Sequence, residues 1–173
     1  MKYAIVYLLR GKIRGYHKKL VKELAQKFKE NYLTKKNPIP PHITLKSPFR
    51  TKYIKEIEKI IKDFTKIKKP SKIKIKGFGN FNKSVIFLKT KFSRKGYKVQ
   101  KELLNKLGLK TQKFDKKWKP HSTIGFSNTK KRFNQMWKYV KSKNPKFDLK
   151  FDNITILKKP RKYWKIYKTF NIK

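Results

Sequence analysis

The sequence predicts an α+β fold of two similar halves that face each other across a cleft. One order of strand-like and helix-like segments occurs twice, once before Asn82 and once after it. The segments do not form a long series of alternating parallel strands and helices, so we expect mainly antiparallel sheets. The same short pattern around a histidine also begins a strand in each half. These observations predict a bilobal, pseudo-two-fold protein whose sheets line a central cleft and whose helices lie outside.

The first half contains a strand, a helix, a strand, a helix and a strand. Tyr3–Leu9 is a continuous apolar run, typical of a buried strand, and apolar residues then recur at helical spacing over Ile13–Phe28. A polar, proline-rich loop leads to a short strand at His42–Ser47. A second helix carries one apolar face over Ile54–Phe64, and the alternation of Lys and Ile over Lys72–Lys76 predicts a half-buried strand.

The second half repeats this order of segments. Its strands and helices are expected at Ser84–Thr90, Val99–Leu107, His121–Phe126, Phe133–Val140 and Phe147–Phe151. The first of these helices is followed by Gly108, a common residue at helix C-termini. An extra strand, roughly Tyr163–Ile172, ends the chain. We therefore expect one domain, residues 1–173, with lobes built from about residues 1–80 and 83–158 plus the C-terminal strand.

The chain is strongly basic. Its 173 residues include 51 Lys and Arg against 9 Asp and Glu, a formal charge of +42, which attracts polyanions at long range. However, 45 of these cations are Lys and 6 are Arg, and the chain has 17 Ile but 2 Ala. Such ratios are typical of an A/T-rich genome. The charge therefore has two interpretations, a selected binding surface or compositional drift, and neither favours a cationic substrate.

The sequence contains no cysteine. This excludes disulfides, thiol nucleophiles and thiolate metal ligands, and it fits a reducing compartment, so we expect a cytoplasmic protein. The apolar run Tyr3–Leu9 is too short for a membrane span or a usual signal-peptide core. We expect no membrane association and no obligate protein partner, and we expect a monomer.

Two of the three histidines have matching neighbours. Pro41-His42-Ile43-Thr44-Leu45 and Pro120-His121-Ser122-Thr123-Ile124 both read Pro-His-x-Thr-aliphatic at the start of an expected strand. Residues i and i+2 of a strand point to the same face, so each histidine shares its face with a threonine. Two such coincidences among three histidines arise by chance about one time in a hundred. His17 lacks the threonine and is expected to be structural or solvated.

Two facing His-Thr pairs suit phosphodiester cleavage. Histidine has an ordinary pKa near 6.5, so one imidazole can take a proton from an attacking water while the other gives a proton to the leaving oxygen. Threonine hydroxyls can donate hydrogen bonds to the non-bridging phosphate oxygens. This chemistry requires no metal, and a chain without cysteine and with 9 carboxylates is poorly supplied with metal ligands.

The duplicated H-x-T-x motif resembles that of the 2H phosphoesterase superfamily, and within it the 2′-5′ RNA ligase and RNA 2′,3′-cyclic phosphodiesterase type. The resemblance implies that His42 and His121 are the catalytic acid and base and that Thr44 and Thr123 bind phosphate. It also implies a bilobal fold, a reaction without metal or cofactor, and an RNA or nucleotide partner carrying a cyclic phosphate.

The expected function is hydrolysis of RNA 2′,3′-cyclic phosphate ends, with 2′-5′ ligation as the reverse reaction. Two alternatives remain open: the same chemistry on a small cyclic or 2′-5′-linked nucleotide, and a non-catalytic RNA-binding protein. Lys46 alternates in phase with Thr44 and is a candidate phosphate contact. Phe49, Trp118 and Phe126 flank the motifs and are candidates for stacking on a base.

Overall fold

The computed structural model describes residues 1–36, 38–126 and 129–173, and it contains two four-stranded antiparallel sheets. The first sheet has the order β2-β1-β7-β8 and is formed by β1 (Lys2–Leu8), β2 (His42–Arg50), β7 (Asn153–Lys159) and β8 (Lys165–Asn171). The second sheet has the order β5-β4-β3-β6 and is formed by β3 (Ser71–Phe81), β4 (Val85–Phe92), β5 (His121–Phe126) and β6 (Lys146–Phe151). The expected α+β class with antiparallel sheets is confirmed.

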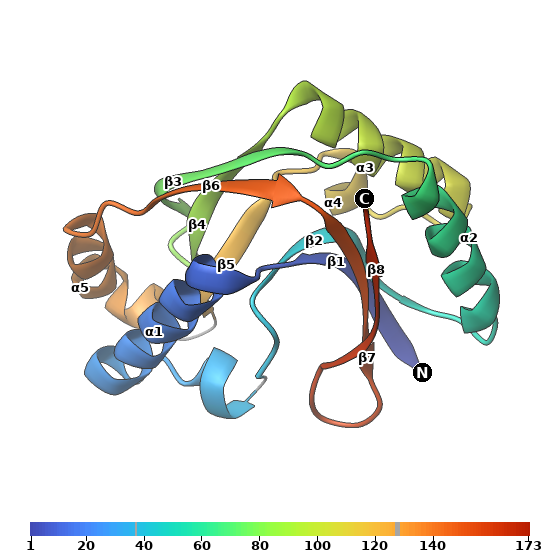
Figure 1. Ribbon diagram of the computed structural model, residues 1–173. Helices are drawn as coiled ribbons and strands as arrows, with labels where there is room; N and C mark the ends of the chain where they lie inside the picture. Colours follow the sequence, from blue (N-terminus) through green and yellow to red (C-terminus); the bar gives the residue numbers. More distant parts are fainter. Residues whose placement is uncertain (37, 127–128) are drawn as a thin grey trace.

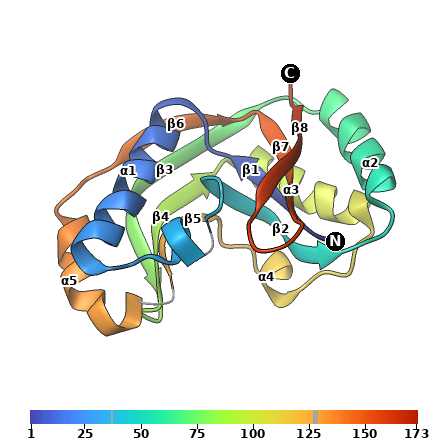
Figure 2. The same ribbon diagram turned by 90° about the horizontal axis from the view of Figure 1, so that it is seen from below.

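The helices pair across the two halves of the sequence. Their bounds are α1 (Gly11–Phe28), α2 (Ile54–Lys66), α3 (Arg94–Leu107), α4 (Lys113–Lys116) and α5 (Thr129–Lys141), with one π-helical turn, η1 (Tyr32–Lys36). Helix α1 contacts α5 at one end of the molecule and α2 contacts α3 at the other, outside the sheets (Figures 1 and 2). As the sequence predicts, α3 ends at Gly108, whose φ of 60° is left-handed.

The sheets exchange strands, which corrects the expected boundaries of the lobes. Strand β3 belongs to the first repeat, yet it lies in the second sheet between β4 and β6. Strand β7, near the end of the chain, returns to the first sheet beside β1. The lobes are therefore not residues 1–80 and 83–158, because each sheet contains strands from both parts of the chain.

Burial follows the alternation of the strands. Ile5, Leu88 and Phe151 belong to one hydrophobic cluster that joins the two sheets. Residues on the opposite face of β1 form a smaller cluster with Leu157 and Trp164, so both faces of this strand are buried and its apolar run is continuous. On β3 the lysines of Lys72–Lys76 are exposed and the isoleucines are buried, as the sequence predicts. Among the described helices, none combines the length and the apolar character that a membrane span requires.

The two motif strands, β2 and β5, are edge strands of different sheets and contact each other. Each contains a β-bulge directly after its threonine. On β2, Thr44 pairs with Val6 and Lys46 with Ile5, which leaves Leu45 as the extra residue. On β5, Thr123 and Gly125 pair with consecutive residues of β4, so Ile124 is extra. Bulges bend a strand and redirect its side chains, and they are common beside active sites.

Candidate active site

The imidazole rings of the two motif histidines have the same hydrogen bond. The Nδ1 atom of His42 lies 2.8 Å from the carbonyl oxygen of Pro40, and Nδ1 of His121 lies 2.7 Å from that of Lys119. A carbonyl oxygen only accepts, so each Nδ1 carries the hydrogen and each neutral ring has its lone pair on Nε2. In both motifs the residue between the carbonyl and the histidine is a proline, whose fixed φ restricts this turn. The fold therefore prepares both Nε2 atoms to accept or donate a proton.

Both histidines titrate at lower pH than a free imidazole. Burial lowers the pKa of His42 to about 4, although the hydrogen bond to Pro40 acts to raise it. The neighbouring charge of His121 also lowers this pKa. Burial also lowers the pKa of His121, whose ring lies between those of Phe81 and Phe87, with centroids 4.9 and 5.0 Å away. In the free protein both rings are therefore neutral at neutral pH. An anion bound between them would favour protonation.

The two threonines share the exposed face of their histidines. Thr44 and Thr123 are partly exposed, whereas the intervening Ile43 and Ser122 are buried. The bulges begin after the threonines, so the alternation that the sequence predicts holds across each His-x-Thr triplet. Each motif therefore presents one imidazole and one hydroxyl on a single face, an arrangement that suits proton transfer and phosphate binding.

A cavity of about 780 Å³ opens beside this site. Among the described residues that line it, Pro41, His42 and Thr123 come from the motifs, whereas His121 and Thr44 lie outside its wall. Helix α1 contributes three cations to the wall, and the neighbouring turn η1 contributes Tyr32. The ring of Tyr32 packs 4.9 Å from that of Phe126, which is 40% exposed and also lines the cavity. Stacking of a base on Phe126 therefore stays a prediction.

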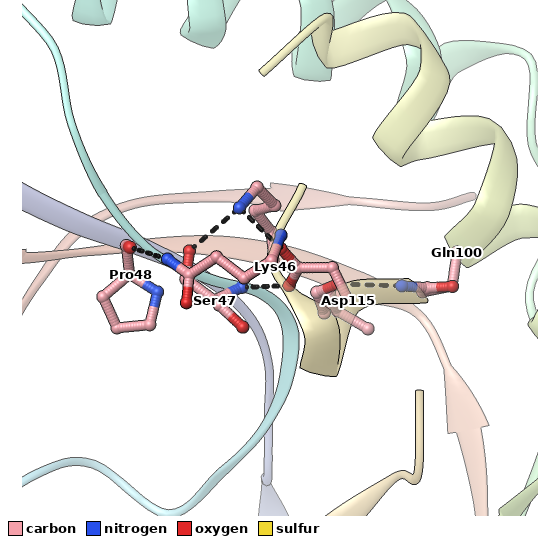
Figure 3. Close-up of polar contacts among 7 residues, drawn as sticks. Lys46, Ser47, Pro48, Gln100 and Asp115 are labelled. Carbon is pink, nitrogen blue, oxygen red and sulfur yellow. Dashed lines mark hydrogen bonds and ion pairs between the residues drawn. The ribbon is translucent and has the colours of Figure 1, made fainter. Parts of the chain in front are cut away.

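Lys46 does not face the cleft, which corrects its assignment as a candidate phosphate contact. The bulge at Leu45 reverses the alternation, so Lys46 is 1% exposed. Its Nζ atom lies 2.8 Å from Oδ2 of Asp115, a side chain that also accepts a hydrogen bond from the backbone nitrogen of Ser47 (Figure 3). Lys46 therefore joins β2 to the α4 region and is not available to a substrate.

Phe49 and Trp118 also lie outside the cavity wall and do not support the stacking hypothesis. Phe49 packs against Tyr3, with ring centroids 6.2 Å apart. Trp118 is partly buried against Phe92, and its Nε1 donates a hydrogen bond of 2.7 Å to the carbonyl oxygen of Thr44. Both aromatic residues pack within the protein, and Trp118 also contacts the backbone of a motif strand.

His17 belongs to the site, although its sequence context does not indicate it. Its side chain is 5% exposed and lines the cavity from α1, and its Nε2 donates to the carbonyl oxygen of Thr123 at 2.9 Å. Burial lowers the pKa of His17 to about 4, and the charge of His42 lowers it further. The one signal in the sequence is position, because His17 follows the buried Ile13 by one helical turn and thus points inward.

The side chains of the site differ from those of a metal centre. Among the described residues, no three or more His, Cys, Asp or Glu side chains form a cluster that could hold a metal ion. The cavity wall combines imidazoles, hydroxyls, aromatic rings and cationic side chains with aliphatic and proline residues.

The chain is similar in sequence to one protein family and to two bacterial proteins over nearly its whole length. A family model described as the 2′-5′ RNA ligase superfamily matches residues 17–162. A Geobacillus thermodenitrificans protein named "Putative phosphoesterase" is 28% identical over 98% of this chain and 95% of its own. A Geobacillus kaustophilus protein of similar name is 26% identical over 98% and 95%.

Solved structures share the fold. The Thermus thermophilus protein TT0787 aligns with a TM-score of 0.65 at 14% identity over 99% of this chain and 98% of its own. Escherichia coli LigT, solved in complex with 3′-AMP, aligns with a TM-score of 0.59 at 14% identity over 99% and 97%.

Proposed function

The chain belongs to the 2′-5′ RNA ligase superfamily, and from this premise we propose that it is a metal-independent phosphodiesterase that opens 2′,3′-cyclic phosphate ends of RNA. His42 and His121 are its acid and base, and Thr44 and Thr123 bind the phosphate. The observation that carries the proposal is the matched pair of Nδ1–carbonyl hydrogen bonds, which leave an Nε2 atom available on each ring.

The reaction is an in-line displacement at phosphorus. The Nε2 of one neutral imidazole takes a proton from water as the water oxygen bonds to phosphorus. The bond from phosphorus to one ribose oxygen breaks, and that oxygen receives a proton from Nε2 of the other, protonated imidazole. The product is a phosphomonoester beside a free ribose hydroxyl. The two rings have then exchanged protonation states, and solvent restores them.

The threonines stabilise the charge that moves onto the phosphate oxygens. A hydroxyl positioned before the reaction contributes most where it meets developing charge in a site shielded from water. The substrate itself helps to establish the required protonation, because its negative charge raises the lowered pKa values of His42 and His121. The reverse reaction, attack of a 5′-hydroxyl on the cyclic phosphate, would use the same groups and form a 2′-5′ linkage.

A second candidate is the same reaction on a small cyclic or 2′-5′-linked nucleotide. The cavity beside His42 supports it, since about 780 Å³ is within the usual size of a site for one small ligand. Its cationic and aromatic wall suits a nucleotide. The solved complex of Escherichia coli LigT with 3′-AMP supports either candidate. 3′-AMP is itself a small nucleotide, and it also matches the last nucleotide of an RNA that ends in a 3′-phosphate.

The test is incubation with a short RNA ending in a 2′,3′-cyclic phosphate, in the presence of EDTA. We expect His42→Ala and His121→Ala each to lower the rate by roughly 10²- to 10⁴-fold, with circular dichroism unchanged. The double variant should be no slower than the slower single variant, because the two groups act as a unit.

A matched reaction with a cyclic mononucleotide distinguishes the two candidates. Loss of activity in EDTA, or full activity in both single variants, would contradict the proposed mechanism. RNA binding without turnover of either substrate would favour the non-catalytic alternative.

A further inference from the structure

Two ring N–H groups cross from one half of the sequence to the motif strand of the other half. His17, in the first half, donates from Nε2 to the carbonyl oxygen of Thr123 at 2.9 Å. Trp118, in the second half, donates from Nε1 to the carbonyl oxygen of Thr44 at 2.7 Å. Each acceptor is the threonine of a His-x-Thr motif. We call these two contacts the crossed bonds.

The crossed bonds occur where the sheets themselves hold the motifs least. Both β2 and β5 are edge strands, so each has a neighbour on one side alone. The ladder to that neighbour is interrupted by the bulge that begins directly after Thr44 and after Thr123. A bulge leaves a residue unpaired and bends the strand. An additional hydrogen bond at the threonine therefore fixes a part of the backbone that the sheet does not fix.

The two strands differ in how many such contacts they receive. Other side chains of the second half also bond to the backbone of β2. Gln100 donates to the carbonyl oxygen of Leu45 at 3.0 Å, and Asp115 accepts from the nitrogen of Ser47 at 2.7 Å (Figure 3). Within the part of the chain that the structure describes, the side-chain bond to the backbone of β5 comes from His17. The position of Thr123 therefore depends on His17 more than that of Thr44 depends on Trp118.

From this geometry we propose that His17 and Trp118 are positioning residues that set the spacing of the two His-Thr pairs through the crossed bonds. The proposal rests on the proposed function, since it assigns these residues a role in placing the groups that act on the phosphate. His17 lies on α1, which also contacts β5 and lines the cavity, so it couples the substrate wall to Thr123.

Positioning residues act on the transition state more than on binding of the substrate. A displacement of about 1 Å in a reacting group can cost on the order of 10²-fold in rate. We therefore expect His17→Met, which removes the donor, to lower kcat roughly 10- to 100-fold with little change in KM. His17→Gln places an amide N–H at the same number of bonds from Cα and should recover most of kcat.

Trp118→Phe keeps an aromatic ring and removes the N–H, and a smaller loss of kcat is expected because other contacts hold β2. Trp137→Phe is the matched control. Trp137 stacks on Phe133 in α5, with ring centroids 5.5 Å apart, and should tolerate the change. In a Thr123→Val background, His17→Met should lower kcat by a smaller factor than in the wild type, because the hydroxyl of Thr123, one of the two groups that the bond helps to place, is then absent.

Backbone hydrogen exchange tests the same proposal without turnover. Loss of a crossed bond should speed exchange in the strand of the opposite half, in β5 for His17→Met and in β2 for Trp118→Phe. This crossed pattern is expected even if the protein hydrolyses no cyclic phosphate, so failure of the proposed function is distinguishable from failure of the inference. Uniformly faster exchange, or no recovery of kcat and of β5 protection by His17→Gln, would overturn it.

Discussion

At the scale of single residues, the buried imidazole of His17 makes the stability of the fold depend on pH. The folded pKa is about 4 and the ordinary value is 6.5, so between these values the unfolded chain binds the proton more readily. Stability is therefore fully present above pH 6.5 and is lost as the pH falls toward 4. The full difference is on the order of 3 kcal/mol. We expect urea unfolding to show this loss between pH 7 and 4.5.

His17→Gln isolates the contribution of His17, because the amide does not titrate. Its unfolding free energy should fall less than that of the wild type over the same range. His42→Gln is the comparison variant, because the pKa of His42 is also about 4 but His42 makes no crossed bond. Its unfolding free energy should likewise depend less on pH than that of the wild type. Parallel curves for the wild type and His17→Gln would refute the assignment.

Some residues of the site can be identified from the sequence and others cannot. His42, His121 and their threonines are recognisable because the signal is local and occurs twice. His17 is not, because its contact with Thr123 joins residues 106 positions apart and no local pattern requires it. Phe81 and Phe87, which pack on His121, are likewise indistinguishable in sequence from core aromatics.

At the scale of elements, the outer edge of β2 depends on Asp115. This carboxylate is 4% exposed and accepts from Nζ of Lys46 and from the backbone nitrogens of Ser47 and Gln112. Removing one partner of a buried ion pair leaves an uncompensated charge and typically costs about 3–5 kcal/mol. We expect Asp115→Ala to destabilise the protein by about this amount in denaturant unfolding.

Asp63→Ala is the matched control, because Asp63 also pairs with a lysine, Lys66, but on the exposed surface of α2. Exposed pairs are worth about 0–1 kcal/mol, so this variant should be nearly neutral. Equal losses in the two variants would show that the pair of Lys46 and Asp115 has no special role.

The sequence predicts some features of the strands correctly and misses others. The period-2 pattern predicts the face of β2 correctly through Thr44, and one extra residue then turns Lys46 inward. The strands expected from the sequence do not separate β7 (Asn153–Lys159) from β6 (Lys146–Phe151), because a single residue lies between them. The exchange of β3 and β7 between sheets is a matter of long-range pairing that no local pattern encodes.

At the scale of the whole molecule, the question is whether the charge of +42 acts as a general field or through placed cations. The cavity supplies a specific hypothesis: Arg14, Lys18 and Lys22 lie four residues apart on α1, and all three line its wall. Four helical residues rise about 6 Å, so the row can follow the backbone of an RNA from its cyclic end. If the charge acts as a general field, every exposed lysine should contribute equally to the binding of RNA. If the row binds the RNA backbone, these three cations should contribute more than the other exposed cations.

Replacing the three cavity cations with Gln should therefore lower kcat/KM for a cyclic-ended RNA and reduce the slope of log(kcat/KM) against log[salt] by about 2, since each contact to a single strand contributes roughly 0.7. The control replaces Lys72, Lys74 and Lys76, which are exposed on β3 and outside the cavity wall, and so removes the same charge. If the two triple variants lose the same activity and the same slope, the charge acts only as a field and compositional drift explains it. A change confined to the cavity variant, and absent with a cyclic mononucleotide, would identify RNA as the substrate that uses the row.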